Sequence, residues 1–140
     1  FVCHGNICRS PMGEFVLKDM AAKAGRSAQF HIASAAVSRE ELGNPIYPPA
    51  QRELQKHGVP FDRRSARQVT KQDLDYYDNI YYMDRNNAQY LRRMFGAQAE
   101  KCQPLLSHDV ADPWYTGDFE VTYRDIVEGV ERLLGDEVVR

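Results

Sequence analysis

Apolar and polar positions divide the chain into short β-rich runs and longer segments with helical periodicity. The β-rich runs cover 1–3, 29–37, 79–83 and 101–105. The segments with helical patterns cover 10–24, 49–57, 86–95 and 119–134. Glycine, proline and asparagine separate the two kinds of segment, and this alternation is typical of βαβ units around a parallel sheet.

The first helix has the clearest sequence signals. Ser10 is predicted to cap it, and Pro11 falls in its first turn, where proline is well tolerated. One apolar residue recurs at every fourth position, as expected for a buried stripe: Met12, Val16, Met20 and Ala24. Gly25 then provides a stop signal.

The length and composition favour a single domain. With 140 residues, of which 43% are hydrophobic, the chain can bury one core but not two. We therefore expect one domain over residues 1–140, with long loops near 38–48, 59–75 and 106–118. Phe1 to Cys3 resemble the end of a strand, so we expect the first strand to be truncated at its start.

Charge and cysteine content exclude several classes of function. The net charge of −2 gives no general attraction to nucleic acid or to an anionic membrane. No apolar run approaches the roughly 20 residues of a membrane helix, and no signal peptide is evident. Cys3, Cys8 and Cys102 are too few for a disulfide framework and lack the partners of a zinc site. We expect a cytoplasmic monomer that binds neither nucleic acid nor membrane.

The segment from Cys3 to Ser10 has the features of an anion-binding loop. It joins a strand to a helix, the position at which open parallel sheets bind ligands. Its backbone N–H groups and the helix dipole can converge on an anion. Gly5 allows a close approach of the backbone, and Asn6 tolerates a left-handed conformation. The loop is therefore predicted to bind phosphate.

Three side chains of this loop suggest a covalent mechanism. The N–H groups, the helix start and Arg9 all favour the thiolate of Cys3, which would make it a nucleophile. Arg9 offers a planar fork for two phosphoryl oxygens. Ser10 can donate to the sulfur of Cys3 and help it leave. A Cys-x5-Arg spacing by itself is weak evidence, and the alternative is a strand-to-helix turn with a buried cysteine.

The segment CHGNICRSP resembles the phosphate loop of the low-molecular-weight protein tyrosine phosphatases. The similarity continues, in the order of that family, through SAAVS at 34–38, HGV at 57–59, ARQVT at 66–70, Tyr82-Met83-Asp84 and Asp112-Pro113-Trp114-Tyr115. The resemblance implies an α/β fold of the flavodoxin-like type, an open parallel four-stranded sheet with helices on both faces. It also implies hydrolysis of phosphotyrosine in a protein or peptide, without a cofactor or metal.

The same resemblance implies roles for individual residues. Cys3 attacks phosphorus and water then releases phosphate, while Asp112 acts first as acid and then as base. Ser34 matches a serine that supports the loop. The implied substrate-binding residues are His4, Gly5, Asn6, Ile7, Cys8, Ser10, Trp114 and Tyr115. Without the resemblance, an aspartate before a proline, such as Asp112, would be interpreted as part of an ordinary turn. The flat rings of Trp114 and Tyr115 nevertheless suit contact with a phenyl ring.

Some positions differ from the family pattern or have two interpretations. Arg64 stands where relatives often have a histidine, so support of the loop from this position should differ. Residues 39–41 carry charges where many relatives have an aromatic residue, which should change peptide preference. Cys8 is either a small packed side chain or a redox partner of Cys3, and His4 is interpreted as a rim contact.

Residues outside the motifs are assigned structural roles. His31, His57 and His108 lack ligand-like spacing and are expected on the surface or in loops. Cys102 is expected to be a core thiol. The tyrosines near the third strand are expected to pack in the strand and core, because no basic residues alternate with them: Tyr76, Tyr77, Tyr81 and Tyr82.

Three alternative functions remain. An arsenate reductase of the same fold needs further cysteines, and residues 70–101 contain none. The protein-arginine phosphatases commonly have threonine at the position of Ile7. A phosphotyrosine-binding module needs only the loop and Arg9, and would have no use for both Cys3 and Asp112.

Overall fold

The computed structural model describes residues 1–139, with side chains described up to residue 135. The strands are β1 (Val2–Cys3), β2 (Ala35–Ala36), β3 (Ile80–Tyr82) and β4 (Cys102–Pro104). The α-helices are α1 (Arg9–Lys23), α2 (Pro48–Lys56), α3 (Lys71–Tyr76), α4 (Arg85–Phe95), α5 (Pro113–Thr116) and α6 (Phe119–Val139). Two 3₁₀ helices are η1 (Ser27–Gln29) and η2 (Gly96–Lys101).

The strands form one parallel sheet in the order β2-β1-β3-β4. Because β1 lies at the centre, Val2 pairs with Ala35 on one side and with Tyr82 on the other. Parallel strands place all their carboxyl ends at the same edge, so the loops after β1, β3 and β4 meet there. The predicted flavodoxin-like α/β fold is confirmed.

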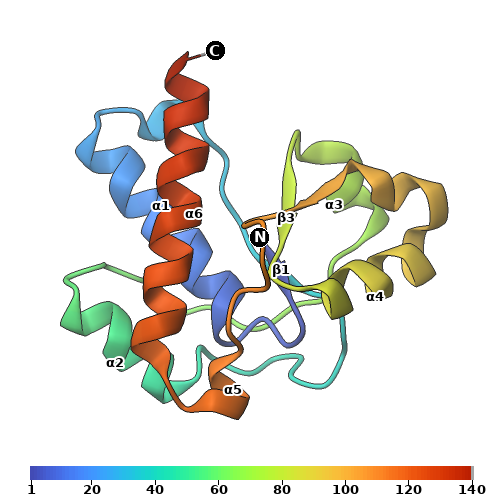
Figure 1. The fold of residues 1–140 in the computed structure, drawn as a ribbon, viewed down its shortest axis with the longest axis horizontal. Helices are drawn as coiled ribbons and strands as arrows, with labels where there is room; N and C mark the ends of the chain where they lie inside the picture. Colours follow the sequence, from blue (N-terminus) through green and yellow to red (C-terminus); the bar gives the residue numbers. More distant parts are fainter. Residues whose placement is uncertain (140) are drawn as a thin grey trace.

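Helices cover both faces of the sheet (Figure 1). On one face α1, α2 and α6 pack together around a core that includes Met12, Leu54 and Ile126. On the other face α3 and α4 bury Leu74 and Leu91 against the strands. The helix α6 approaches the chain after β4 so closely that a Cβ at Gly129 would lie 2.5 Å from a Leu105 side-chain carbon. Glycine at this position therefore permits the close packing.

Several sequence predictions need correction. The predicted strand over 29–37 is limited to Ala35–Ala36, because only these residues pair with β1, and it is preceded by η1. The predicted loop over 59–75 contains the start of α3, whose capping box joins Thr70 and Asp73 and was a readable signal. The loop over 106–118 contains α5.

The buried stripe of α1 is confirmed at Met12 and Val16 but wrong at Ala24, which is exposed just after the helix ends. Cys102 is buried in β4, and His31, His57 and His108 are exposed. Tyr77, Tyr81 and Tyr82 pack partly against the two cores. Tyr76 is 60% exposed, so its predicted core packing is wrong; it ends α3 at the surface. Among the described residues, no helix is long and apolar enough to cross a membrane.

Candidate active site

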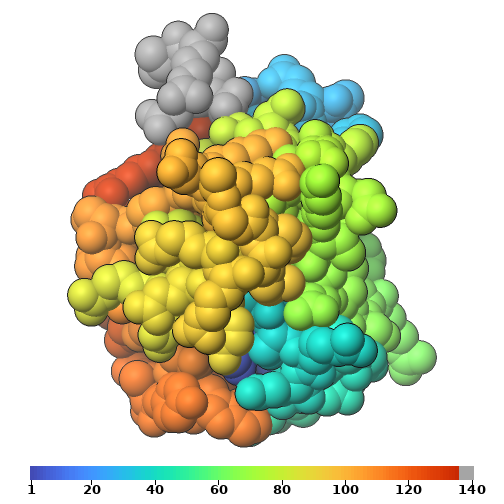
Figure 2. All heavy atoms as spheres, turned by 90° about the vertical axis from the view of Figure 1, so that its right-hand side faces the viewer, coloured from blue at the N-terminus to red at the C-terminus, as the bar shows by residue number. Residues whose placement is uncertain are grey.

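The loop after β1 forms the floor of a pocket at the carboxyl edge of the sheet. The pocket has a volume of about 500 Å³. Its walls come from residues 40–41, the start of α4, and the segment of Asp112, Trp114 and Tyr115. In Figure 2 the blue N-terminal residues are visible only in the hollow between the yellow α4, the cyan segment and the orange α5. The predicted phosphate loop is therefore recessed but open to solvent.

Hydrogen-bond donors converge on the sulfur of Cys3. The backbone N–H groups of Asn6 and Ser10 lie 3.3 and 3.4 Å from Sγ, and the Ser10 hydroxyl lies at 3.0 Å. Asn6 Nδ2 donates to the same hydroxyl oxygen at 2.8 Å, so the single hydroxyl hydrogen can point either at Sγ or at the Ala35 oxygen, which lies 3.4 Å away. Donors directed at this point would stabilise an anion bound beside the sulfur.

Ser10 does not cap α1, which corrects the sequence prediction. The residue before the helix is Cys8, no side chain caps the helix, and Ser10 lies in its first turn. The first N–H groups of a helix have no partner within the helix. One of them, the Ser10 N–H, points at Cys3 Sγ, so the start of α1 faces the position of an anion in the loop.

Asn6 holds the loop in shape. Its φ of 61° is left-handed, and its buried side chain is surrounded by partners. Nδ2 donates to Ser10 Oγ and, at 2.9 Å, to Ser34 Oγ, while Oδ1 accepts from the backbone N–H of Arg67 at 3.2 Å. Ser34 thus lies where a supporting residue was predicted.

A buried carboxylate continues this network and was missed in the sequence. Ser34 donates to Glu14 Oε1 at 2.6 Å, and Lys18 Nζ donates to Glu14 Oε2 at 2.6 Å. Glu14 is only 8% exposed. A glutamate among the apolar residues of the helix, with a lysine four residues later, was the available signal.

Arg64 also contacts the loop. Its Nη2 donates to the backbone oxygen of Asn6 at 2.6 Å. The arginine therefore supports the loop through its backbone, at the residue whose conformation is left-handed.

Arg9 is buried at the start of α1, with 2% of its surface exposed. Its Nη1 donates to Asp84 Oδ2 at 2.7 Å and to the Val110 oxygen at 3.0 Å, and its Nη2 donates to Asp112 Oδ2 at 3.3 Å. Burial lowers the pKa of Arg9, but the negative charges of Cys3, Asp112 and Asp84 outweigh it and raise the pKa above its usual value. Arg9 is therefore a permanent cation beside the loop.

Asp84 is a second residue whose role the sequence did not reveal. It caps α4 through a capping box with Asn87, and its other oxygen receives Arg9. The spacing Asp-x-x-Asn directly after β3 was a readable cap signal. That cap fixes the carboxylate, and the carboxylate orients the guanidinium.

Asp112 enters the site from the opposite loop. It precedes Pro113 at the start of α5, and its Oδ1 accepts the Trp114 N–H at 3.1 Å. Its Oδ2 reaches Arg9, so residues more than one hundred positions apart in the chain meet in one pocket. Trp114 and Tyr115 are 55% and 85% exposed, and the Trp114 ring lies 5.1 Å from the ring of Tyr47.

The remaining predicted residues form the floor and rim. His4 lies at the rim, with Nε2 2.9 Å from Glu40 Oε2, and Gly5 faces Glu41. Ile7 and Cys8 are buried next to Ala66 while lining the pocket.

The thiol of Cys8 differs from that of Cys3. Burial, followed by the nearby charge of Cys3, raises the pKa of Cys8 to about 12. Cys8 is therefore a neutral thiol at physiological pH. The structure records Cys3 and Cys8 as free cysteines.

A cysteine that faces N–H and O–H donors beside a buried arginine, at the switch point of a parallel sheet, is the arrangement of phosphatases that act through a cysteine. Comparison with known proteins makes the class specific. A family model described as low molecular weight phosphotyrosine protein phosphatase matches residues 1–140. The chain belongs to this family, whose members are hydrolases.

Individual relatives agree with this assignment. The chain is 42% identical to the low molecular weight protein-tyrosine-phosphatase YfkJ of Bacillus subtilis, over 96% of this chain and 91% of that protein. The crystal structure of YfkJ matches with a TM-score of 0.93, covering 97% of this chain and 91% of the other. The human low molecular weight phosphotyrosine protein phosphatase is 36% identical over 91% of this chain and 87% of its own length. A Drosophila arginine phosphatase is similar in structure, with a TM-score of 0.88, 28% identity, and coverage of 98% and 95%.

Proposed function

We propose that this protein hydrolyses phosphotyrosine in protein substrates through a cysteinyl-phosphate intermediate. The observation that carries the proposal is that Arg9 links the two halves of the site. It lies beside the loop that surrounds Cys3 and contacts Asp112 at 3.3 Å. A module that only binds phosphotyrosine has no need for a nucleophile and an acid in one pocket.

In the first step the thiolate of Cys3 attacks phosphorus and the bond between phosphorus and the tyrosine oxygen breaks. Asp112, protonated, gives its proton to the departing phenolate oxygen. The N–H groups of the loop and the guanidinium of Arg9 receive the charge of the transferring phosphoryl group. A bound phosphate competes with Asp112 for Arg9, which frees the carboxyl group to face the leaving oxygen.

In the second step water attacks the phosphorus of the cysteinyl phosphate. Asp112, now a carboxylate, takes a proton from the water, and the bond between sulfur and phosphorus breaks. The Ser10 hydroxyl, 3.0 Å from Sγ, donates to the departing thiolate. No step requires a metal or cofactor.

The rim supports an aromatic substrate. Trp114 and Tyr115 expose their rings on the wall that carries Asp112, so an aryl group bound above the loop can pack against them. Ile7 adds an apolar contact at the floor.

The direct test is phosphate release from a phosphotyrosine peptide in EDTA, followed by acid quenching and mass analysis. We expect release in EDTA and a phosphoryl group on Cys3 in the quenched enzyme. A protein that binds the peptide but releases no phosphate would be a binding module, and the proposal would be wrong.

A second candidate is hydrolysis of phosphoarginine, because a Drosophila arginine phosphatase shares the fold over nearly the whole chain. Ile7 favours tyrosine, since its bulk suits a flat ring. A phosphoarginine peptide of matched sequence distinguishes the two: we expect kcat/KM to be higher for phosphotyrosine.

We further propose that residues 1–140 act as one cytoplasmic domain and as a monomer, without a nucleic-acid or membrane partner. The near-neutral charge and the free cysteines support this. Light scattering during gel filtration tests the monomer, and a mass twice that of the chain would contradict it.

A further inference from the structure

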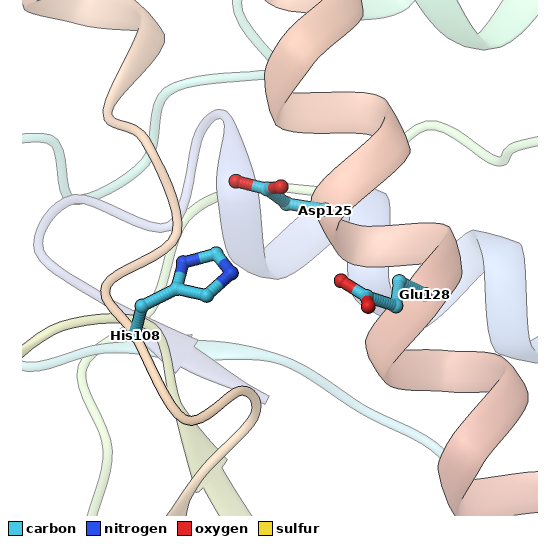
Figure 3. Close-up of side chains that lie close together, drawn as sticks. All are labelled: His108, Asp125 and Glu128. Carbon is cyan, nitrogen blue, oxygen red and sulfur yellow. The ribbon is translucent and has the colours of Figure 1, made fainter.

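Three side chains of the kinds that bind metal ions lie close together outside the pocket. His108 belongs to the loop between β4 and α5, and Asp125 and Glu128 lie three residues apart on α6. One ligand atom of each residue lies within 4.8 Å of the other two. Figure 3 shows the imidazole facing α6, with both carboxylates directed toward the ring.

The hydrogen bond of His108 determines which ring nitrogen is free. Nδ1 lies 3.0 Å from the backbone oxygen of Asp109. A carbonyl oxygen can only accept, so Nδ1 carries the hydrogen. In the neutral ring Nε2 then presents a lone pair, and an Nδ1–H bond to a backbone carbonyl is the usual outer contact of a histidine that binds a metal through Nε2.

The carboxylates leave room for a cation. Among the described residues, the histidines within 4.0 Å of a carboxylate are His4 and His57, so His108 does not form a direct ion pair. Asp125 uses Oδ2 to accept the Ala111 N–H at 3.4 Å, and Glu128 uses Oε1 to accept from Arg132 at 3.1 Å. Each carboxylate therefore keeps one oxygen without a described partner. Arg132 offsets part of the charge of Glu128, and a cation between the free carboxylate oxygens and the imidazole lone pair would offset the repulsion that remains.

We propose that His108, Asp125 and Glu128 form a surface site for a divalent transition metal ion such as Zn²⁺, with water at the remaining position. One imidazole nitrogen and carboxylate oxygens are a donor set that suits zinc. Zinc bonds to these atoms are about 2.0–2.2 Å long, so the ligand atoms must approach each other slightly. His108 and Glu128 are exposed, and rotation of their side chains is sufficient.

The site would join the loop of the proposed acid to the longest helix. His108 lies four residues before Asp112, and this loop is already attached to α6 where Thr122 Oγ1 donates to the Ala111 oxygen at 2.8 Å. A bound ion adds a second attachment. Because the ion binds only the folded arrangement, it should stabilise the protein without taking part in the reaction.

The test titrates ZnCl₂ into the full chain carrying Cys3→Ser, because the thiolate of Cys3 would itself bind zinc. Calorimetry should give one site per chain, and His108→Ala in the same background should weaken binding at least about tenfold. Glu128→Gln should weaken it as well. Glu131→Gln, an exposed glutamate one turn further along α6, is the matched control and should bind as the parent does.

A second measurement guards against misfolding and against binding at a thiol. Thermal unfolding should show an increase in Tm with zinc for the parent and the Glu131 variant, and none for the His108 variant. When cobalt replaces zinc, the absorption spectrum of the protein should lack the intense near-ultraviolet band that a thiolate ligand produces. Equal zinc affinity with and without His108, or a thiolate band, would overturn the proposal.

Discussion

The two loops that form the pocket are built in opposite ways. The phosphate loop is buried: Asn6, Ser10 and Arg9 are all at most 2% exposed and are held by a polar network. The opposite loop presents Trp114 and Tyr115 to solvent and is attached to the first through the Asp112 contact with Arg9. The difference indicates that anion binding depends on a buried, hydrogen-bonded part of the fold, whereas proton transfer and substrate contact depend on a more exposed one.

Replacing the nucleophile should have the largest effect. We expect Cys3→Ser to lower kcat by at least about 10⁴-fold, because a serine hydroxyl is a much weaker nucleophile than a thiolate and Cys8 in the same pocket is a neutral thiol. The N–H groups and Arg9 remain, so phosphate or phosphopeptide binding should still be measurable by calorimetry. Activity near that of the parent would exclude the covalent mechanism.

Removing the acid of the exposed loop should slow hydrolysis by an amount that depends on the leaving group. We expect Asp112→Asn to slow hydrolysis of aryl phosphates by about 10²–10⁴-fold, the usual contribution of a positioned acid. The loss should be smaller when the leaving phenolate is a weak base, because such a leaving group needs less protonation. A series of substituted phenyl phosphates measures this, and equal losses across it would contradict the acid role.

Within the buried loop, Arg9→Lys tests geometry rather than charge. A lysine keeps the positive charge but cannot form two parallel hydrogen bonds, so we expect kcat/KM to fall by about 10²–10³-fold. Circular dichroism and unfolding should show whether the fold survives the loss of the Asp84 contact. A kcat/KM within twofold of the parent value would show that the two parallel hydrogen bonds of the guanidinium are not used in catalysis.

The network below the loop should affect stability more than chemistry. Ser34→Ala removes the link between Asn6 and Glu14 and leaves a buried carboxylate oxygen without its donor. We expect a loss of about 1–3 kcal/mol in the free energy of unfolding, measured in urea, with a smaller decrease in kcat/KM. Ser65→Ala, at an exposed serine, is the control. If both variants unfold alike, the network does not stabilise the loop.

Cys8 should have the smallest effect on catalysis. Its raised pKa, about 12, keeps it a neutral thiol, so iodoacetamide and peroxide should modify Cys3 first. We expect Cys8→Ser to retain much of its activity but to recover less well with dithiothreitol after brief peroxide treatment, because a disulfide can no longer protect Cys3. Equal recovery, or no loss of two hydrogens in oxidised wild type, would make Cys8 only a packed side chain.

The sequence by itself determined the elements and motifs that depend on neighbouring residues. Local patterns of apolarity, glycine and caps predict the order of the four strands, the helices α1, α2, α4 and α6, the phosphate loop and the left-handed Asn6. They were not used to predict α3 or α5. The sequence also provided cap signals for α3 and α4, at Thr70 and Asp84, that were readable but not used.

Only the tertiary structure decided what joins distant parts of the chain. No local sequence pattern links the residues that meet in these contacts. They are the contact of Arg9 with Asp112, the burial of Glu14 below Ser34, the bond of Arg64 to the loop and the approach of His108 to α6. The same holds for Ser10, whose local sequence suits a cap but whose hydroxyl faces Cys3. Local patterns fix backbone conformation within a few residues, whereas these contacts depend on how the sheet brings separate loops to one edge.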